Sequence, residues 1–220
     1  MIKACVFDCD GTLLDTVVSI GYCANRALRD FGFCEYGMDD YKKFVGDGAA
    51  TLIRRCLIHA GDSNCDYFED VFKRYMEYFA VDCMYEVEPY EGIVETVREL
   101  KKTGIAVTVL SNKPHAQTLK VIEDTLGTQT FEYVQGQMEG IAIKPAPDGA
   151  LAIAKALNVE PEECLYIGDT GTDMKTGNAA GMHTVGVLWG FRGRQELVEN
   201  HAENIIEKPQ EMLQLVKMFE

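Results

Sequence analysis

The sequence predicts an α/β protein in which a doubly wound, mostly parallel sheet is interrupted by an inserted all-helical segment. Short apolar runs alternate with helical patterns over most of the chain, as expected when parallel strands are joined by helices. Polar or glycine residues follow most of these runs directly, which is typical of strand ends. Between residues 15 and 88 the alternation stops and only helical patterns occur, which indicates the insertion.

Six apolar runs are expected to be strands, because short runs without alternation are typical of strands buried on both faces. They lie at residues 2–7, 105–110, 131–134, 164–167, 184–188 and 204–206, with the last at an edge. Helical patterns at 92–103, 148–157 and 173–180 separate several of these runs, and a final helix is expected from Pro209 onward.

The inserted segment contains four helical patterns, at 16–31, 39–44, 49–60 and 67–79, and no convincing strand. We therefore expect two domains. Residues 1–14 and 89–220 would form the α/β core, and residues 15–88 would form a helical cap domain inserted between the first strand and the rest of the core. Residues 88–92 would return the chain from the cap to the core.

The charge balance is acidic, because 21 lysine and arginine residues stand against 35 aspartate and glutamate residues, a formal net charge of −14. Such a surface repels phosphate backbones and anionic lipids, so we expect no nucleic acid and no membrane as partners. A small anionic ligand would need a pocket with local positive charge.

The compartment is expected to be the cytoplasm. The opening residues MIKACVFDCDG show no signal-peptide pattern, and no apolar run approaches the roughly 18 residues of a membrane span. The eight cysteines include no C-x-x-C pair, which excludes the usual zinc spacing and favours reduced thiols.

Polar side chains gather where the predicted strands end. They are Asp8 and Asp10 after the first run, Ser111 and Asn112 after the second, Asp169 and Asp173 after the run at 164–167, and Lys144 before the helix at 148–157. Ligands of open parallel sheets bind outside the carboxyl ends of the strands. We therefore expect four carboxylates, a hydroxyl, an amide and an ammonium group to converge on one crevice.

Clustered carboxylates need compensation. A like-charged pair about 4 Å apart costs on the order of 4 kcal/mol at an effective dielectric constant near 20. A Mg²⁺ ion, which prefers oxygen ligands, and the ammonium group of Lys144 would offset this repulsion and could together hold a phosphate group. Taken singly, the same residues have simpler explanations as turn aspartates, helix caps and a surface lysine.

Taken in order, these residues resemble the four motifs of the haloacid dehalogenase superfamily. The matching segments are DCDGTL at 8–13, SNK at 111–113, KPAP at 144–147 and GDTGTD at 168–173. The resemblance covers nearly the whole chain, and residues 15–88 match the family's helical cap. It implies a Rossmann-like core and a magnesium-dependent phosphoryl-transfer enzyme.

The resemblance also implies residue roles. Asp8 would be the nucleophile that forms an aspartyl phosphate, and Asp10 the general acid and then the general base. Lys144 would neutralise charge that develops in the transition state. Asp8, the backbone carbonyl of Asp10 and Asp169 would bind Mg²⁺, while Asp173 would orient metal-bound waters or Lys144.

Four further residues would hold the phosphate group. Gly11 would permit a tight turn and Thr12 would fix that loop, whereas Ser111 and Asn112 would donate hydrogen bonds to phosphate oxygens. The segment WGFR at 189–192 is either a core aromatic turn or a loop that resembles one common in the family.

The cap is expected to determine substrate specificity, since the chemistry of the core is shared by enzymes with different substrates. Gly46 and Gly48 precede a helix that carries Arg54 and Arg55, and this segment resembles the cap of phosphoglycolate phosphatases. One arginine would bind the carboxylate of a small phosphorylated acid, unless both are surface side chains.

The sequence therefore predicts a magnesium-dependent phosphatase of a small phosphate ester, with 2-phosphoglycolate as the favoured substrate. A β-phosphoglucomutase-like phosphosugar mutase and a non-catalytic phosphate-binding or regulatory module are the alternatives.

Overall fold

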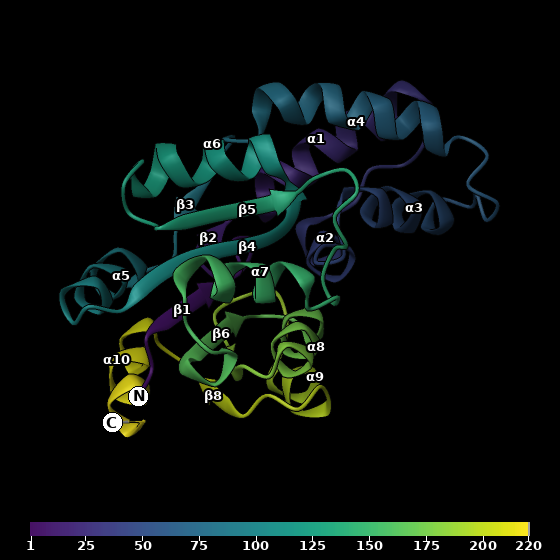
Figure 1. The fold of residues 1–220 in the computed structure, drawn as a ribbon. Coiled ribbons are helices and arrows are strands. Elements are labelled where there is room, and N and C mark those ends of the chain that lie inside the picture. The colour runs from purple at the N-terminus through teal and green to yellow at the C-terminus, as the bar shows by residue number, and fades with distance from the viewer. Residues whose placement is uncertain (220) are drawn as a thin grey trace.

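The centre of the protein is a six-stranded parallel sheet with the strand order β5-β4-β1-β6-β7-β8, seen in a computed structural model that describes residues 1–219 (Figure 1). The strands are β1 (Ala4–Phe7), β4 (Ala106–Pro114), β5 (Tyr133–Gln137), β6 (Cys164–Gly168), β7 (His183–Val187) and β8 (Asn204–Ile206). The chain winds outward from β1 in both directions. The predicted doubly wound α/β fold is therefore confirmed, with a strand at each of the six predicted runs.

Different helices cover the two faces of the sheet, because alternate side chains of a strand point to opposite faces. Cys5 and Phe7 of β1 belong to one apolar cluster, whereas Ala4 and Val6 belong to another. The first cluster includes residues of α5 (Ile93–Lys102), α6 (His115–Leu126) and α10 (Met212–Met218), and the second those of α7 (Asp148–Leu157) and α8 (Gly171–Ala180). Burial on both faces explains why the strands are apolar throughout.

The expected helical segment contains four helices. They are α1 (Val17–Asp30), α2 (Met38–Phe44), α3 (Ala49–His59) and α4 (Phe68–Asp82), close to the predicted ranges. All four lie beyond the carboxyl ends of β1, β4 and β5 (Figure 1). Their buried side chains, Tyr41 and Tyr75 among them, continue the larger apolar cluster of the core.

A short strand pair joins the helical segment to the sheet. β2 (Leu14–Asp15) and β3 (Glu88–Pro89) run antiparallel, with Asp15 opposite Glu88. The chain therefore leaves the core and returns to it at adjacent points. This pair lies where the sequence places both ends of the inserted segment.

The structure differs from expectation at the second strand and at two helices. β4 continues through residues 111–113 to Pro114, and its register with β5 shifts between Leu110 and Pro114. Such irregularities bend a strand and redirect its side chains. The helices α6 and α9 (Arg194–Glu199) were not predicted either.

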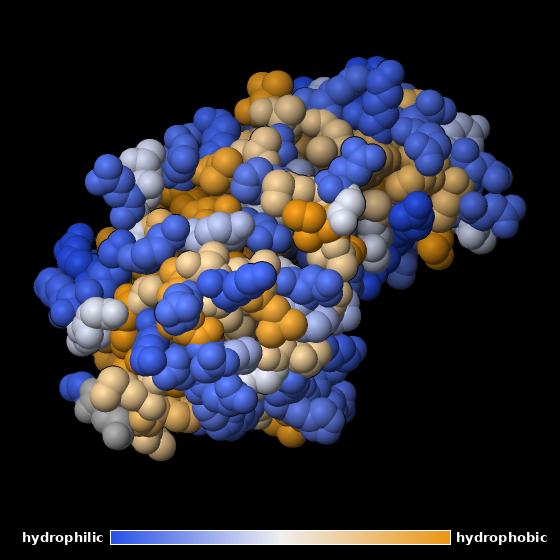
Figure 2. Space-filling model, viewed as in Figure 1, coloured by the Kyte–Doolittle hydropathy of each residue, from blue (hydrophilic) through white to orange (hydrophobic). Residues whose placement is uncertain are grey.

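The surface follows from the composition. Figure 2 shows hydrophilic side chains over most of the face in view, with smaller apolar patches between them. Within residues 1–219, no helix combines the length and the apolar character that a membrane crossing requires.

Candidate active site

Three buried carboxylates meet at the carboxyl end of the sheet. Asp8, Asp169 and Asp173 each place one oxygen within 4.8 Å of the others. The sheet register causes this convergence, because Phe7 of β1 pairs with Ile167 of β6 and the chain continues from each strand into an aspartate. The amide of Asp8 also donates to the carbonyl of Ile167 at 2.8 Å.

Lys144 bridges two of these carboxylates. Its Nζ lies 2.8 Å from Oδ1 of Asp8 and 2.7 Å from Oδ1 of Asp173. The second oxygen of Asp173 accepts from the hydroxyl of Thr170 at 2.6 Å. Asn112 fixes the backbone of Lys144, since its Oδ1 accepts from the Lys144 amide at 2.9 Å and its Nδ2 donates to the Lys144 carbonyl at 3.0 Å.

The pKa directions indicate an excess of negative charge. Burial, and then the charge of Asp173, raise the pKa of Asp8 to about 7 even though Lys144 opposes the change. Burial, followed by Asp173 and Asp8, raises the pKa of Asp169 well above its ordinary value. Burial lowers the pKa of Lys144, but Asp173 and Asp8 outweigh it and raise that pKa well above its usual range.

This donor set fits a hard divalent cation. Crowded carboxylate oxygens with raised pKa values are the ligands that Mg²⁺ prefers and whose repulsion it relieves. The four carboxylates of the site, which include Asp10, are opposed by two ammonium groups, those of Lys144 and Lys113. One divalent cation would offset the remaining two charges.

Asp10 lies beside these three buried carboxylates and pairs with Lys113. Its Oδ1 accepts from Nζ of Lys113 at 2.8 Å and from the hydroxyl of Thr16 at 2.6 Å. The Lys113 side chain is only 1% exposed. Lys113 belongs to the SNK motif at 111–113, but no role was predicted for it; the signal in the sequence is a charged residue that follows an apolar run.

The loop after β1 shapes the position of Asp169. Gly11 adopts a left-handed φ of +83°, and a Cβ there would lie 2.4 Å from Oδ2 of Asp169. The hydroxyl of Thr12 donates to Oδ1 of Asp169 at 3.1 Å, and the amide of Phe191 donates to Oδ2 at 2.7 Å. The segment 189–192 therefore contacts the site directly.

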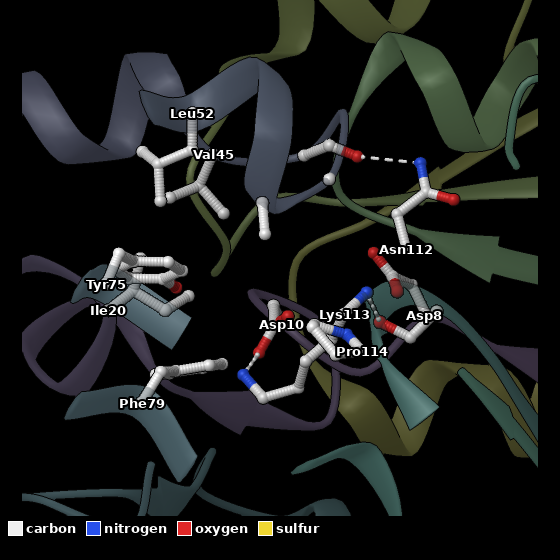
Figure 3. Close-up of a pocket in the computed structure, with 14 residues that line it drawn as sticks. Asp8, Asp10, Ile20, Val45, Leu52, Tyr75, Phe79, Asn112, Lys113 and Pro114 are labelled. Carbon is white, nitrogen blue, oxygen red and sulfur yellow. Dashed lines mark hydrogen bonds and ion pairs between the residues drawn. The ribbon is translucent and has the colours of Figure 1, made fainter. Parts of the chain in front are cut away.

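A pocket opens beside Asp8 and Asp10, between the sheet and the helical segment (Figure 3). Ser111, Asn112 and Lys113 line its core side, whereas its other side is largely apolar. The apolar lining includes Ile20, Val45, Leu52, Tyr75 and Phe79. Its volume of about 40 Å³ holds only a few water molecules, so the arrangement suits a small ligand.

The predicted glycine loop reaches this pocket. Gly46 and Gly48 both line it, with φ values of +121° and +86° that favour glycine. The carbonyl of Gly46 accepts from Nδ2 of Asn112 at 3.2 Å. The structure therefore brings this loop to the core, as expected from the glycine spacing.

The two cap arginines lie elsewhere. Neither Arg54 nor Arg55 lines the pocket. The guanidinium of Arg54 lies 3.8 Å from the ring centre of Phe68. Arg55 donates to the carbonyl of Phe44 at 2.7 Å and pairs with Asp47, so both side chains serve contacts within the helical segment.

Comparison of the sequence and the structure with known proteins identifies the class of protein. Residues 5–187 match the family model of the haloacid dehalogenase-like hydrolases. The chain belongs to this family, and its curated relatives place it among the family's phosphatases.

The individual relatives carry a narrower name. The phosphoglycolate phosphatase of Aquifex aeolicus is 30% identical over 189 residues, which cover 86% of each chain. Phosphoglycolate phosphatase 1 of Pseudomonas aeruginosa is 28% identical over 213 residues, covering 94% of this chain and 77% of that protein. A crystal structure from Lactobacillus delbrueckii subsp. bulgaricus, provisionally assigned as a phosphoglycolate phosphatase, superposes with a TM-score of 0.93 at 27% identity, covering 97% and 98% of the two chains.

Proposed function

We propose that this protein is a magnesium-dependent phosphatase that hydrolyses a small phosphorylated carboxylic acid, 2-phosphoglycolate, through an aspartyl phosphate on Asp8. The observation that carries the proposal is the buried Asp8 carboxylate, which faces the pocket and lies 2.8 Å from Lys144. An anionic nucleophile next to a fixed ammonium group suits attack on a phosphate ester.

The site residues support both half-reactions. An oxygen of Asp8 attacks phosphorus, the bond from phosphorus to the ester oxygen breaks, and Asp10 gives a proton to the leaving oxygen. Asp10 then takes a proton from water, which attacks phosphorus and releases phosphate from Asp8. The contacts of Asp10 with Lys113 and Thr16 both use Oδ1, which leaves Oδ2 for these proton transfers.

The metal would be held by Asp8, Asp169 and the backbone carbonyl of Asp10. Mg²⁺ bound there would neutralise phosphate charge and orient the ester for attack. Asp173 would act through Lys144 and metal-bound waters. The phosphate group would be surrounded by Gly11, Thr12, Ser111 and Asn112. The ammonium group of Lys144 would neutralise the negative charge that develops on it in the transition state.

Two observations support phosphoglycolate in particular. Named phosphoglycolate phosphatases match most of the chain at 28–30% identity. The pocket is small and lined in part by Gly46 and Gly48, which suits an ester with few atoms beyond its phosphate group.

Residues 15–88 would act as a cap that covers the bound ester, with the remaining chain as the catalytic core. Hydrogen bonds from Asn112 to Gly46 and from Thr172 to Asp47 join the two parts, which supports a cap that covers the core. A cap of this kind excludes water during the reaction and opens for product release.

The cytoplasm is the proposed compartment and a small phosphate ester the proposed partner, with neither nucleic acid nor membrane involved. The eight cysteines are free thiols, and all except Cys34 and Cys65 are buried, which suits a reducing environment.

Release of inorganic phosphate from a panel of esters tests the proposal. The panel comprises 2-phosphoglycolate, ethyl phosphate, pyrophosphate, nucleoside monophosphates and sugar phosphates, each with MgCl₂ or with excess chelator. We expect 2-phosphoglycolate to be the ester hydrolysed with the highest kcat/KM, and turnover to be lost with chelator. Preference for another ester would refute the substrate, whereas conversion of a sugar phosphate without phosphate release would indicate a mutase.

A further inference from the structure

The pocket contains a single basic side chain, and the proposed mechanism gives it no role. Among the lining residues only Lys113 is basic. Its buried ammonium group lies 2.8 Å from Oδ1 of Asp10 and 4.7 Å from the ring centre of Phe79. An ammonium group has three donors, and Asp10 engages one of them, so Lys113 can also bind an anion in the pocket.

The position of Lys113 suits the end of the substrate that does not react. Ser111 and Lys113 are alternate residues of β4, and both line the pocket. Alternate residues of a strand are separated by on the order of 7 Å. A phosphate group next to Ser111 and Asp8 therefore leaves a second anionic group, a few atoms away, within reach of Lys113.

Tyr75 supplies a second donor from the opposite wall. Its side chain is buried, and Figure 3 shows its hydroxyl directed into the pocket from α4 with no partner among the lining side chains. Within the described residues this hydroxyl has no hydrogen-bond partner, and it is open to the pocket, so it is available to a ligand or to water. A phenol hydroxyl can donate to a carboxylate.

The remaining lining strengthens this interaction. Ile20, Val45 and Leu52 form an apolar wall of the same pocket, and apolar surroundings increase the attraction between opposite charges. Arg54 and Arg55, the other candidates for carboxylate binding, are engaged with Phe68 and Asp47.

We infer that Lys113, assisted by the hydroxyl of Tyr75, binds the carboxylate of the substrate and determines specificity for phosphorylated acids. This inference rests on the proposed function for the position of the phosphate group. It replaces the cap arginines as the source of specificity by a lysine of the core.

A matched pair of esters tests the inference. Ethyl phosphate differs from 2-phosphoglycolate in carrying a methyl group where the acid has its carboxylate. The measured quantity is the specificity ratio, defined as the kcat/KM value for the acid divided by the kcat/KM value for ethyl phosphate. We expect Lys113→Met to lower this ratio by about ten- to a hundredfold and Tyr75→Phe by about tenfold, the range for a lost hydrogen bond to a charged group.

Lys120→Met is the matched control, because it removes an exposed lysine that pairs with Asp124 on α6. The ratio should not change in this variant. Lys113 also contacts Asp10, so Lys113→Met should slow both esters. Equal losses for the two esters would show that Lys113 acts only through Asp10 and would overturn the inference.

Binding separates this inference from the proposed function. In an Asp8→Asn background with MgCl₂, calorimetry should show tighter binding of 2-phosphoglycolate than of ethyl phosphate, and adding Lys113→Met or Tyr75→Phe should reduce the difference. If the parent protein does not hydrolyse 2-phosphoglycolate but this dependence on Lys113 persists, the proposed function fails and the inference stands. Equal binding of both esters before and after Lys113→Met overturns the inference.

Discussion

Asp8 is fixed on one side of its carboxylate and free on the other. Its Oδ1 accepts from the amide of Cys9 at 2.6 Å and from Lys144 at 2.8 Å. Oδ2 is therefore the oxygen available for bond formation with phosphorus. Cys9 contributes only its backbone amide to this arrangement, and its side chain is buried.

Asp8→Asn should reduce phosphate release by at least about 1000-fold, because an amide is a poor nucleophile. The measurement is turnover of the best ester in the panel with saturating MgCl₂. Circular dichroism should be unchanged, since the amide keeps the shape of the side chain. Parental turnover in a folded Asp8→Asn protein would refute the nucleophile assignment.

The carboxylate cluster should make metal-free protein less stable as the pH rises. Burial and then Asp173 raise the pKa of Asp8 from 3.8 to about 7, so the folded state holds this proton more tightly than the unfolded state. Stability therefore falls as the pH increases from about 4 to 7. The raised pKa of Asp169 acts in the same direction.

Thermal melting at pH 5 and pH 7.5, with and without MgCl₂, measures this effect. We expect the metal to raise Tm more at pH 7.5, where the carboxylates are ionised and repel one another. Equal increments at the two pH values would contradict the charge assignment. Asp8→Asn, which removes one of the charges, should reduce the difference between them.

Much of the site could be predicted at this scale, because its aspartates and Lys144 lie in short motifs next to strand ends. The environment of Asp10 could not, since Lys113 is 103 residues away and pairs with it only after the sheet forms. Tyr75 gave no signal either, because an aromatic residue at helical spacing is more often part of a core.

Helix α3 forms where it was predicted, but the structure places neither of its two arginines in the pocket. Neighbouring residues on a helix point about 100° apart, so Arg54 and Arg55 contact different partners, and Arg54 lies over the ring of Phe68. Arg55 instead donates to the carbonyl of Phe44, where α2 ends, and pairs with Asp47. Asp47 in turn accepts from Thr172 of the core at 2.6 Å.

Arg55→Ala should lower Tm by about 2–4 °C, because a partly exposed ion pair and a carbonyl contact together contribute about 1 kcal/mol. Arg29→Ala is the control, since Arg29 forms a more exposed pair with Glu35, and its Tm should change by less than about 1 °C. Arg55→Ala should also leave the specificity ratio between 2-phosphoglycolate and ethyl phosphate unchanged. A loss confined to 2-phosphoglycolate would restore Arg55 as a ligand.

The elements themselves were largely predictable, because continuous apolar runs mark the buried strands and helical periodicity is strong between them. Helix α6 was missed although its residues Thr118, Val121 and Ile122 are buried at helical spacing. The extension of β4 to Pro114 depends on pairing with β5. Local sequence does not encode such pairing.

On the scale of the whole molecule, Arg192 connects the core to the helical segment. From the loop after β7 it donates to the carbonyls of Lys42, Lys43 and Val45 around the end of α2, and it pairs with Glu196. The last carbonyls of a helix lack partners within the helix, so these bonds stabilise the contact between α2 and the loop after β7.

Arg192→Ala should therefore accelerate amide hydrogen exchange in α2, by about tenfold if the lost contacts contribute about 1.4 kcal/mol. Mass spectrometry of peptides that span residues 38–46 measures the change. Arg194→Ala is the control, because Arg194 pairs with Glu207 and exposes over half of its side chain. Unchanged exchange in the Arg192→Ala protein would mean that other contacts suffice to hold α2 in place.

The strand pair at the base of the helical segment has a consequence for the history of such chains. Asp15 and Glu88 are direct partners, so their Cα atoms lie only about 5 Å apart. A single tight turn could span that gap, and none of the six parallel strands would need to be rerouted. Genetic recombination at this seam can therefore lengthen, shorten or exchange everything between the two points, while the aspartates of the site and the order of the sheet are inherited unchanged.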